Sequence, residues 1–481
     1  MNQSKKIISG TLWTTLSTIV TAVVQIMRLA ILTKFLAKSD FGVVAVLTFV
    51  LGLTHTFSDL GFASAIMHKR DLTRKDFSSL YWIQLLVFSL IYLVVIALSS
   101  PIAAYFKEPA IIALLPLSML DLVLQGFGKL YDTLLQRNFQ FKLLAFRNIV
   151  SAIVSLALAI VLAILGYGVY SLVLSTLLHS LILNLWNLIQ GQKIVRLKLY
   201  CSVRPVWPLI KIGVYQTGTQ ILDYFSSKLD ILIIGRVLGM ENLGIYNLAK
   251  DLIIRALQLI NTIASRVILP YFSSIQNDIV AMRDNYCRLI RFISAPNFFI
   301  YTVLGVFSVP IVLALYGREW TDVAPILAIL SLWGLLISVG NPVGNVVIAK
   351  GRTDISFRYT IVRIVVSLPT IYILSLFGLY VMSWGQVVLA AIMLWLSWYM
   401  QLYPVIELKL LEFIRSFDKG LLLSFAVICF ALIVNASIDS AIVATSVCAF
   451  LFAIYIAFLY RMNGEVIASI MALRYKRNRR N

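Results

Sequence analysis

Long apolar runs alternate with short polar segments along the whole chain. Because the hydrocarbon core of a bilayer is about 30 Å thick, a membrane-spanning helix needs roughly 20 mostly apolar residues. The runs have this length and predict an all-α polytopic membrane protein with about fourteen transmembrane helices. The expected spans are 10–33, 41–66, 78–100, 110–135, 143–165, 168–190, 207–234, 242–266, 286–315, 323–349, 357–377, 379–402, 419–437 and 440–460.

The composition agrees with this pattern. The chain has 481 residues, of which 60% are hydrophobic and 13% are charged. Soluble domains contain about 45–50% apolar and about 25% charged residues, so no sizeable soluble domain is expected. The net charge of +20 could suggest nucleic-acid binding. However, the basic residues lie in alternate loops, as the positive-inside rule describes for membrane proteins. We therefore expect no nucleic-acid partner.

Positive charge is concentrated on one side of the predicted bundle. Both termini fall on this basic side, so we expect both in the cytoplasm and an even number of spans. The basic side carries Lys5, Lys6, His68, Lys69, Arg70, Arg74, Lys75, Arg137, Lys142, Lys193, Arg196, Lys198, Arg204, Arg283, Arg288, Lys350, Arg352, Arg358 and the tail from Arg474 to Arg480.

Two stretches in the two halves of the chain resemble each other. GTLWTTLSTIVTAVVQIMRLAILTKFLAKSDFG begins at Gly10, and GVYQTGTQILDYFSSKLDILIIGRVLGMENLG begins at Gly213. Aligned at their ends, they place Arg28 opposite Asp230. Such a repeat with equal orientation predicts two parallel six-helix lobes. We expect an N-lobe at 1–200 with spans one to six and a C-lobe at 201–403 with spans seven to twelve. Residues 404–481 would form an amphipathic linker, two extra C-terminal helices and a basic cytoplasmic tail.

Charged residues lie inside several predicted spans, where each costs at least about 2.5 kcal/mol unless it faces a partner or a wet cavity. They are Arg28, Asp59, Asp121, Lys129, Asp132, Asp223, Lys228, Asp230, Lys250, Asp251, Arg255 and Arg363. Some can be neutralised along one helix, as Lys129 with Asp132, Asp251 with Arg255, and His55 with Asp59. Lys34, Arg147 and Arg236 lie near span ends, where a long side chain can reach the membrane surface.

Five of these charged residues have no such local explanation: Arg28, Lys228, Asp230, Lys250 and Arg363. They predict a polar chamber between the two lobes, and the alternative is a set of structural pairs between helices. Arginine and lysine suit an anionic ligand, because a guanidinium binds phosphate bidentately and an ammonium supplies a point charge. The excess of basic residues therefore favours an anionic substrate.

The sequence contains no motif for enzymatic chemistry. It has no GxxxxGK[ST] loop for ATP hydrolysis and no HExxH motif. Its four cysteines lack metal-ligand spacing. The loops expected on the outer side are too short for a typical membrane glycosyltransferase. We expect a protein that is not an enzyme and that has neither a metal site nor a bound cofactor.

Several segments resemble bacterial polysaccharide exporters of the colanic-acid type. They are DLGFASAIMHKRDLTRKDFSSLYWIQL (59–85), LLQRNFQFKLLAFRNIVSAIVSLALAIVLAILGYGVYSLV (134–173), KLDILIIGRVLGMENLGIYNLAKDL (228–252) and VILPYFSSIQND (267–278). The resemblance implies membership of the multidrug/oligosaccharidyl-lipid/polysaccharide exporter superfamily, with two lobes in a V around a cavity. It also implies a flippase of the bacterial inner membrane that moves O-antigen- or exopolysaccharide-type repeat units on undecaprenyl diphosphate.

The resemblance further implies which residues bind the diphosphate. In related lipid II flippases, arginines of the first, second and eighth spans bind this region. Arg28 in span one and Lys250 with Arg255 in span eight match by helix and rough depth. Span two carries Asp59 rather than an arginine, so Lys129 or Lys228 would supply that charge, and Arg363 joins the expected substrate-binding set. The implied partners are the lipid-linked oligosaccharide, membrane lipids, and polysaccharide polymerase and glycosyltransferases.

The expected mechanism is alternating access, in which the headgroup enters the chamber and the lobes rock to release it outward. Coupling is expected from protons, from sodium or from the membrane potential. The candidate ion carriers are Asp59, Asp132 and Asp230, and Arg28 with Asp230 is a candidate gate pair. One alternative is a cation-coupled drug antiporter of the same architecture, whose cavity would be dominated by acids. Another is a membrane glycosyltransferase or ligase.

Overall fold

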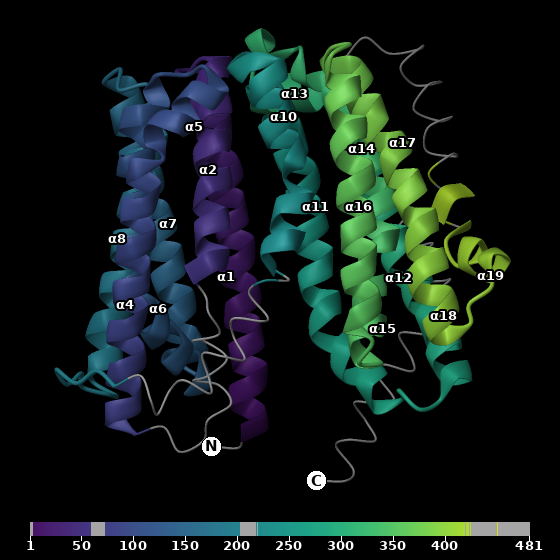
Figure 1. The fold of residues 1–481 in the computed structure, drawn as a ribbon, viewed down its shortest axis with the longest axis horizontal. Coiled ribbons are helices and arrows are strands. Elements are labelled where there is room, and N and C mark those ends of the chain that lie inside the picture. The colour runs from purple at the N-terminus through teal and green to yellow at the C-terminus, as the bar shows by residue number, and fades with distance from the viewer. Residues whose placement is uncertain are drawn as a thin grey trace. The chain divides into compact units, whose positions relative to one another are not determined.

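Every regular element in the described part of the chain is a helix (Figure 1). The computed structural model describes residues 3–58, 73–202 and 220–418, together with positions 218, 420–422, 424 and 450. Contacts divide the chain into two compact units, Met1–Asn247 and Leu248–Asn481. Within each unit the long helices lie side by side as a bundle (Figure 1).

The first unit contains the helices of the first six predicted spans. They are α1 (Gln3–Leu32), α2 (Lys38–Ser58), α4 (Arg74–Ala97), α5 (Ser99–Phe106), α6 (Ala110–Arg137), α7 (Phe141–Ile164) and α8 (Val169–Gln192). The short helix α10 (Leu229–Val237) and the first turns of α11 (Gly239–Ser274) also belong to this unit.

The second unit begins within α11 and continues to the C-terminal side. Its elements are α12 (Ile279–Val306), α13 (Ser308–Leu315), the 3₁₀ helix η1 (Arg318–Trp320), α14 (Val323–Gly340), α15 (Val343–Ala349), α16 (Thr353–Ser375), α17 (Leu379–Ser397), the π-helical turn η2 (Trp398–Leu402), α18 (Tyr403–Ile406) and α19 (Leu410–Arg415).

Ten helices among the described residues are long and apolar enough to cross a membrane. They coincide with predicted spans one to six and nine to twelve, so the all-α polytopic fold class is confirmed. Span eight corresponds to α11. The first part of span seven lies outside the described residues, as do nearly all of spans thirteen and fourteen.

Four predicted spans contain a break in the helix within the described residues. In span three, α4 and α5 meet at Leu98. In span seven, α10 begins only after Lys228, whose backbone is not helical. In span nine, α12 and α13 meet at Phe307. In span ten, α14 ends before Pro342, and α15 starts after it. Proline has no backbone N–H to continue a helix but is well suited to starting one. Hydropathy does not detect such breaks, because the flanking side chains remain apolar.

The third span starts at Arg74 rather than at residue 78, because a capping box precedes it. The hydroxyl of Thr73 accepts from the Asp76 backbone N–H at 3.2 Å, and the Asp76 carboxylate accepts from the Thr73 backbone N–H at 3.3 Å. These bonds satisfy two of the backbone N–H groups that a helix start leaves without partners. The helix therefore begins in the polar segment, before the apolar run.

Small polar side chains lie among the apolar residues of the first unit's interior, and large apolar side chains cover its outside. Ser151, Ser171 and Ser175 are fully buried, whereas Leu93 and Ile164 are 60% and 64% exposed. Lipid tails are as apolar as leucine, so burial of leucine gives little drive for helices to associate in a membrane. Small residues allow close approach and hydrogen bonding instead. This arrangement is the one expected for helices that pack inside a bilayer.

The starts of α2 and α11 cross with their backbones in contact. A Cβ added to Gly42 would lie 2.0 Å from the carbonyl oxygen of Met240, and one added to Gly244 would lie 2.0 Å from that of Lys38. Only glycine permits this approach. Gly42 aligns with Gly244 in the sequence repeat, and Lys38 aligns with Met240. The two contacts are therefore equivalent under the internal repeat.

The boundary between the compact units falls after Asn247, because α10 packs against α2 and α5. One of these contacts is a hydrogen bond from Arg236 Nη1 to the carbonyl oxygen of Tyr105 at 2.6 Å. The predicted lobes, by contrast, follow the sequence repeat and divide at 200/201. That division into lobes stays a prediction.

Candidate functional site

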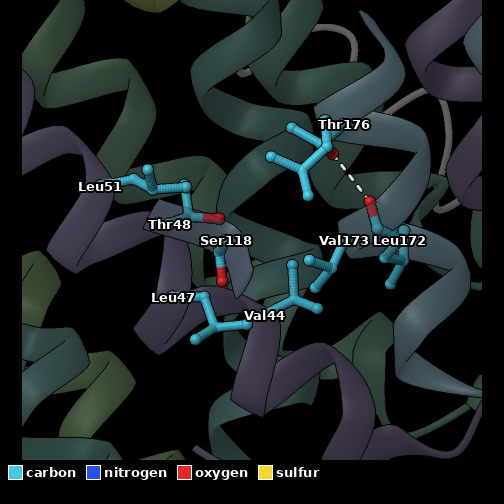
Figure 2. A pocket seen from close by; sticks show the side chains of 9 residues that line it. Val44, Leu47, Thr48, Leu51, Ser118, Leu172, Val173 and Thr176 are labelled. Atoms are coloured by element: carbon cyan, nitrogen blue, oxygen red, sulfur yellow. Dashed lines mark hydrogen bonds between the residues drawn. The ribbon is translucent and has the colours of Figure 1, made fainter. Parts of the chain in front are cut away.

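Arg28 on α1 is anchored to α8. Its Nη2 donates to the carbonyl oxygen of Leu172 at 2.7 Å and to Thr176 Oγ1 at 2.9 Å. Leu172 and Thr176 are four residues apart and lie on one face of α8. Thr176 Oγ1 donates in turn to the Leu172 carbonyl at 2.8 Å (Figure 2). These contacts hold a cationic group in a defined orientation within a membrane-spanning segment.

A second polar group connects α2 with α6. His55 Nε2 lies 3.1 Å from Asp121 Oδ2, and Gln125 Nε2 donates to the same oxygen at 2.8 Å. The nitrogens of Gln125 and His55 are 3.1 Å apart. The sequence predicts that His55 pairs with Asp59, which lies outside the described residues. The structure pairs His55 with Asp121. We refer to His55, Asp121 and Gln125 as the histidine–aspartate cluster.

His179 on α8 lies near both of these groups. Its ring hydrogen-bonds the backbone of Ser151, and the charges of Arg28, Asp121 and Arg147 act on it. Its Nδ1 is buried and has no hydrogen-bond partner within the described part of the chain. His179 follows Thr176 by three residues, so it lies on the face of α8 that binds Arg28. It therefore shares a helix face with the Arg28 anchor and lies within reach of the charge of Asp121.

A small cavity of about 40 Å³ lies between α2, α6 and α8 (Figure 2). Its wall is mostly apolar but includes the hydroxyl groups of Thr48, Ser118 and Thr176. A cavity of this size exceeds the space that one water molecule needs. The lining residues are Val44, Leu47, Thr48, Leu51, Ser118, Leu172, Val173, Thr176 and Leu177.

Asp132 belongs to a buried network that joins α6, α7 and α8. Arg147 Nη1 lies 2.9 Å from Asp132 Oδ1 and also donates to Asn187 Oδ1. Gln136 Nε2 donates to Asp132 Oδ2 at 2.8 Å. The expectation that Arg147 reaches the membrane surface is wrong, because this side chain is 7% exposed and ion-paired inside the unit. Lys129 lies on the same helix, with its ammonium 5.8 Å from the centre of the Phe88 ring.

Asp230 is buried in the first turn of α10 and is 3% exposed. Tyr246 Oη donates to its Oδ2 at 2.6 Å, and the Ile231 backbone N–H donates to its Oδ1 at 3.0 Å. Lys228 is half-buried at the break just before α10. In this structure, Arg28 and Asp230 thus each have partners on other elements. The predicted gate pair stays a prediction.

The predicted site residues of the second unit lie on α11 and α16. Lys250 is 5% exposed, with its ammonium 5.2 Å from the centre of the Trp333 ring. Arg255 forms the predicted ion pair with Asp251 at 2.7 Å, so that assignment is confirmed. Arg363 stacks 5.9 Å from the ring of Tyr359, one turn away on α16. These cations lie beside aromatic rings or an acid, which lowers the cost of placing them inside a span.

Sequence reasoning did not identify His179 or Tyr246 as members of these networks. The signal for Tyr246 is weak, because its partner lies sixteen residues away on another helix. Part of the histidine–aspartate cluster could have been predicted from the sequence, because Asp121 and Gln125 are four residues apart and so share one face of a predicted span. Among the described residues no group of three or more His, Cys, Asp and Glu side chains could hold a metal ion.

Solved structures share this fold. The lipid II flippase MurJ, in an inward closed conformation, aligns with a TM-score of 0.74 at 15% identity, over 94% of this chain and 99% of that one. An inward-facing multidrug resistance MATE family transporter of the MOP superfamily aligns with a TM-score of 0.62 at 16% identity, over 78% of this chain and 93% of that one. The fold is that of a polytopic helical membrane protein.

Residues 31–325 match the family model described as polysaccharide biosynthesis protein, and the chain belongs to this family. The lipopolysaccharide biosynthesis protein WzxC of Escherichia coli K12 is 27% identical over 417 residues, which cover 86% of this chain and 85% of WzxC. The teichuronic acid biosynthesis protein TuaB of Bacillus subtilis 168 is 25% identical over 434 residues, 88% of each chain. The succinoglycan biosynthesis transport protein ExoT of Rhizobium meliloti 1021 is 23% identical over 395 residues, 80% of this chain and 78% of ExoT. The resemblance deduced from the sequence motifs is confirmed.

Proposed function

We propose that the protein flips oligosaccharide repeat units linked to undecaprenyl diphosphate from the cytoplasmic to the outer leaflet of the bacterial inner membrane. The observation that carries the proposal is Arg28, a guanidinium held by α8 inside the first span. A diphosphate cannot cross a hydrocarbon core unless protein groups replace its water, and a guanidinium binds phosphate oxygens bidentately.

The relatives support a polysaccharide substrate. ExoT is described as a succinoglycan transport protein, and WzxC and TuaB are described as proteins of lipopolysaccharide and teichuronic acid biosynthesis. MurJ, which shares the fold, is described as a lipid II flippase. These polymers differ in their sugars, so the chemistry common to their precursors is a sugar on a lipid-linked phosphate carrier.

The other predicted substrate contacts are Lys129, Lys228, Lys250, Arg255 and Arg363. Lys250 is a suitable second anion contact, because its ammonium is a cation buried within α11 beside the indole ring of Trp333. Arg255 is placed on the same helix, five residues further. Arg28 on α1 and Lys250 with Arg255 on α11 are the proposed contacts of the diphosphate.

Alternating access is the mechanism we propose, with the termini and the basic loops in the cytoplasm. The crossing of α2 and α11 at Gly42 and Gly244 supports it. That contact is made by backbone atoms that the internal repeat relates to each other. The prenyl chain would stay in lipid while the headgroup passes. Protons, sodium or the membrane potential would supply the driving force.

A vesicle assay tests the proposal. Lipid-linked repeat units extracted from the producing bacterium would be labelled on the sugar with a fluorophore that external dithionite quenches, and then reconstituted with the full-length protein. If the protein flips the lipid, external dithionite should also quench the fluorophores that start in the inner leaflet. Replacement of Arg28 by alanine removes charge-assisted bonds worth about 1.5–3 kcal/mol, so the initial rate should fall roughly 10- to 100-fold.

The matched control is Arg318→Ala, since Arg318 is an exposed arginine on η1. This variant should flip at the wild-type rate. Flipping no faster than in protein-free vesicles, or an Arg28→Ala rate equal to wild type, would overturn the proposal. Uptake of a cationic dye driven by a pH gradient, in place of lipid flipping, would identify the drug-antiporter alternative.

A further inference from the structure

A short basic segment runs along one end of the first unit. Residues 193–202 follow α8 without forming a helix, and we call them the basic strap. In Figure 1 the strap is the irregular blue-teal segment at the lower left edge of the first bundle. Its cations Lys193, Arg196 and Lys198 are exposed. They do not belong to the proposed substrate contacts, so the proposed function does not explain them.

Hydrogen bonds from α4 hold the strap in place. The Lys198 backbone N–H donates to Ser78 Oγ at 3.0 Å, and Trp82 Nε1 donates to the Lys198 carbonyl oxygen at 3.0 Å. Further along, the Ser202 backbone N–H donates to Ser79 Oγ at 3.1 Å. These bonds satisfy backbone groups in a segment that has no helix of its own. The strap therefore follows a defined path along α4.

The strap has an apolar inner edge. Val195 and Leu197 pack against the buried cluster of α4 and α6, and Tyr131 Oη on α6 donates to the Val195 carbonyl oxygen at 3.1 Å. Arg196 and Lys198, which alternate with them, are exposed. Successive side chains of an extended segment point to opposite sides. One edge of the strap thus binds the bundle, and the other presents cations.

The strap lies where membrane-spanning helices end. Helices α4 and α8 each contain 24 residues and are among the candidate membrane spans. Each is about 36 Å long, which exceeds the hydrocarbon thickness of about 30 Å, so helix ends reach the headgroup layer. The strap leaves the end of α8 and bonds to the first three turns of α4. It is therefore placed beside lipid headgroups.

The start of α4 adds two cations to those of the strap. Arg74 and Lys75 are exposed, and the Lys75 ammonium lies 5.4 Å from the centre of the Tyr200 ring. The neighbouring acid, Asp76, is buried in the capping box of α4. Within the described residues, no ion pair is formed by any of the five exposed cations Arg74, Lys75, Lys193, Arg196 and Lys198. Their charge is available to an anionic partner.

Apolar side chains stand among these cations. Leu199 is 94% exposed, and Ile194 and Tyr200 are also open to the surroundings. Cations mixed with exposed apolar side chains are typical of segments that lie in the membrane interface, and tyrosine is enriched there. An acidic protein would complement the charges but gives no reason for a protruding leucine. Lipid accounts for both features.

We propose that the basic strap is a docking site for anionic phospholipids, with headgroup phosphates on its cations and Leu199 among the acyl chains. By the positive-inside rule, these lipids belong to the cytoplasmic leaflet, whose surface is negative. Bound lipid fastens the end of α8 to α4 and α6 through the strap. The site lies wholly within the first unit, and its lipid binding does not rest on the proposed flippase function.

Cys201 provides a natural reporter, because it is an exposed free cysteine within the strap. The full-length protein, with Cys287, Cys429 and Cys448 replaced by serine, would carry a bimane fluorophore on Cys201. Phosphatidylglycerol with a nitroxide near the start of its acyl chain would be titrated into detergent micelles that contain the protein. We expect saturable quenching of bimane, and much weaker quenching by phosphatidylcholine with the same nitroxide.

Removal of charge tests the cations. Each cation near an anionic surface strengthens binding about fivefold, so Lys193→Gln/Arg196→Gln/Lys198→Gln should weaken the apparent affinity for phosphatidylglycerol at least about tenfold. The matched control is Lys34→Gln/Lys107→Gln/Arg318→Gln, which removes three exposed cations outside the strap. It should bind like the wild type. Leu199→Ser should reduce quenching at saturating lipid, because the fluorophore is then held less deeply.

Thermal unfolding in detergent gives a second measurement. Phosphatidylglycerol should raise the unfolding temperature of the wild type and of the control, and it should raise that of the strap variant less. Equal quenching by the two lipids, or equal affinities of the wild type and the strap variant, would overturn the proposal. Leu199→Ser with unchanged quenching would refute the insertion of Leu199. A polyglutamate peptide that shifts bimane fluorescence when phosphatidylglycerol does not would identify an acidic protein segment instead and overturn the lipid site.

Discussion

Gly42 on α2 and Gly244 on α11 occupy equivalent positions in one symmetric contact. Each glycine lies against the carbonyl oxygen of the residue four before the other glycine, Met240 for Gly42 and Lys38 for Gly244. Residues that the sequence repeat aligns therefore contact each other where α2 and α11 begin. A contact made by two glycines and two carbonyls leaves no room for a side chain on either helix.

Alanine at either glycine should disturb this crossing. A Cβ would lie 2.0 Å from a backbone oxygen, so the helices must move apart, at a cost of about 1–3 kcal/mol. We expect Gly42→Ala and Gly244→Ala to lower the thermal unfolding temperature in detergent. Gly344→Ala is the matched control, because a Cβ there meets nothing within 4 Å. Equal unfolding temperatures in all three variants would contradict the tight crossing.

The buried pair of Arg147 and Asp132 should stabilise the first unit against separation of its helices. Removing one partner of a buried ion pair leaves the other charge uncompensated and costs about 3–5 kcal/mol in fully buried cases. Because Asp132 is partly exposed, we expect the lower end of this range for Arg147→Met. The double variant Arg147→Met/Asp132→Leu should unfold at a higher temperature than Arg147→Met alone. If the double variant is no more stable than Arg147→Met, the ion pair of Arg147 and Asp132 does not stabilise the first unit.

The bond from Tyr246 to Asp230 should fix the position of α10. Tyr246→Phe removes a 2.6 Å bond to a buried carboxylate, which should cost about 1.5–3 kcal/mol. Chemical denaturation followed by tryptophan fluorescence measures the loss. Tyr372→Phe is the control, because Tyr372 is half exposed on α16. If both variants have the same unfolding midpoint, the hydrogen bond from Tyr246 to Asp230 does not contribute to stability.

The predicted gate of Arg28 and Asp230 has its own test. In the structure, Arg28 is bonded to α8 and Asp230 to Tyr246, so the gate would form in another conformation of the transport cycle. Arg28→Asp and Asp230→Arg should each abolish flipping, and the double reversal should restore part of it. The vesicle assay measures all three variants. An inactive double reversal with wild-type expression and folding would refute the gate.

The sequence alone determined the class of protein and most of its spans. Hydropathy acts through the side chains of one continuous helix, so ten of the predicted spans coincide with the ten apolar helices of the described residues. One pair within a single helix, Asp251 with Arg255, was also predicted correctly, because its two residues are one turn apart. The helix break at Lys228 was not predictable from the sequence, because it changes the backbone without changing the apolar pattern.

Only the tertiary structure decided which charges meet across helices. His55 lies at hydrogen-bond distance from Asp121, sixty-six residues away, and Arg147 bonds to Asp132 on another helix. Hydrogen bonds of this kind require atoms within about 3 Å, and that distance depends on the rotation and depth of each helix in the bundle. Periodicity places a polar residue on one face of its own helix, but it does not specify which other helix that face contacts. The identity of the partners therefore came from packing, in which small residues such as Gly42 allow the helices to approach closely.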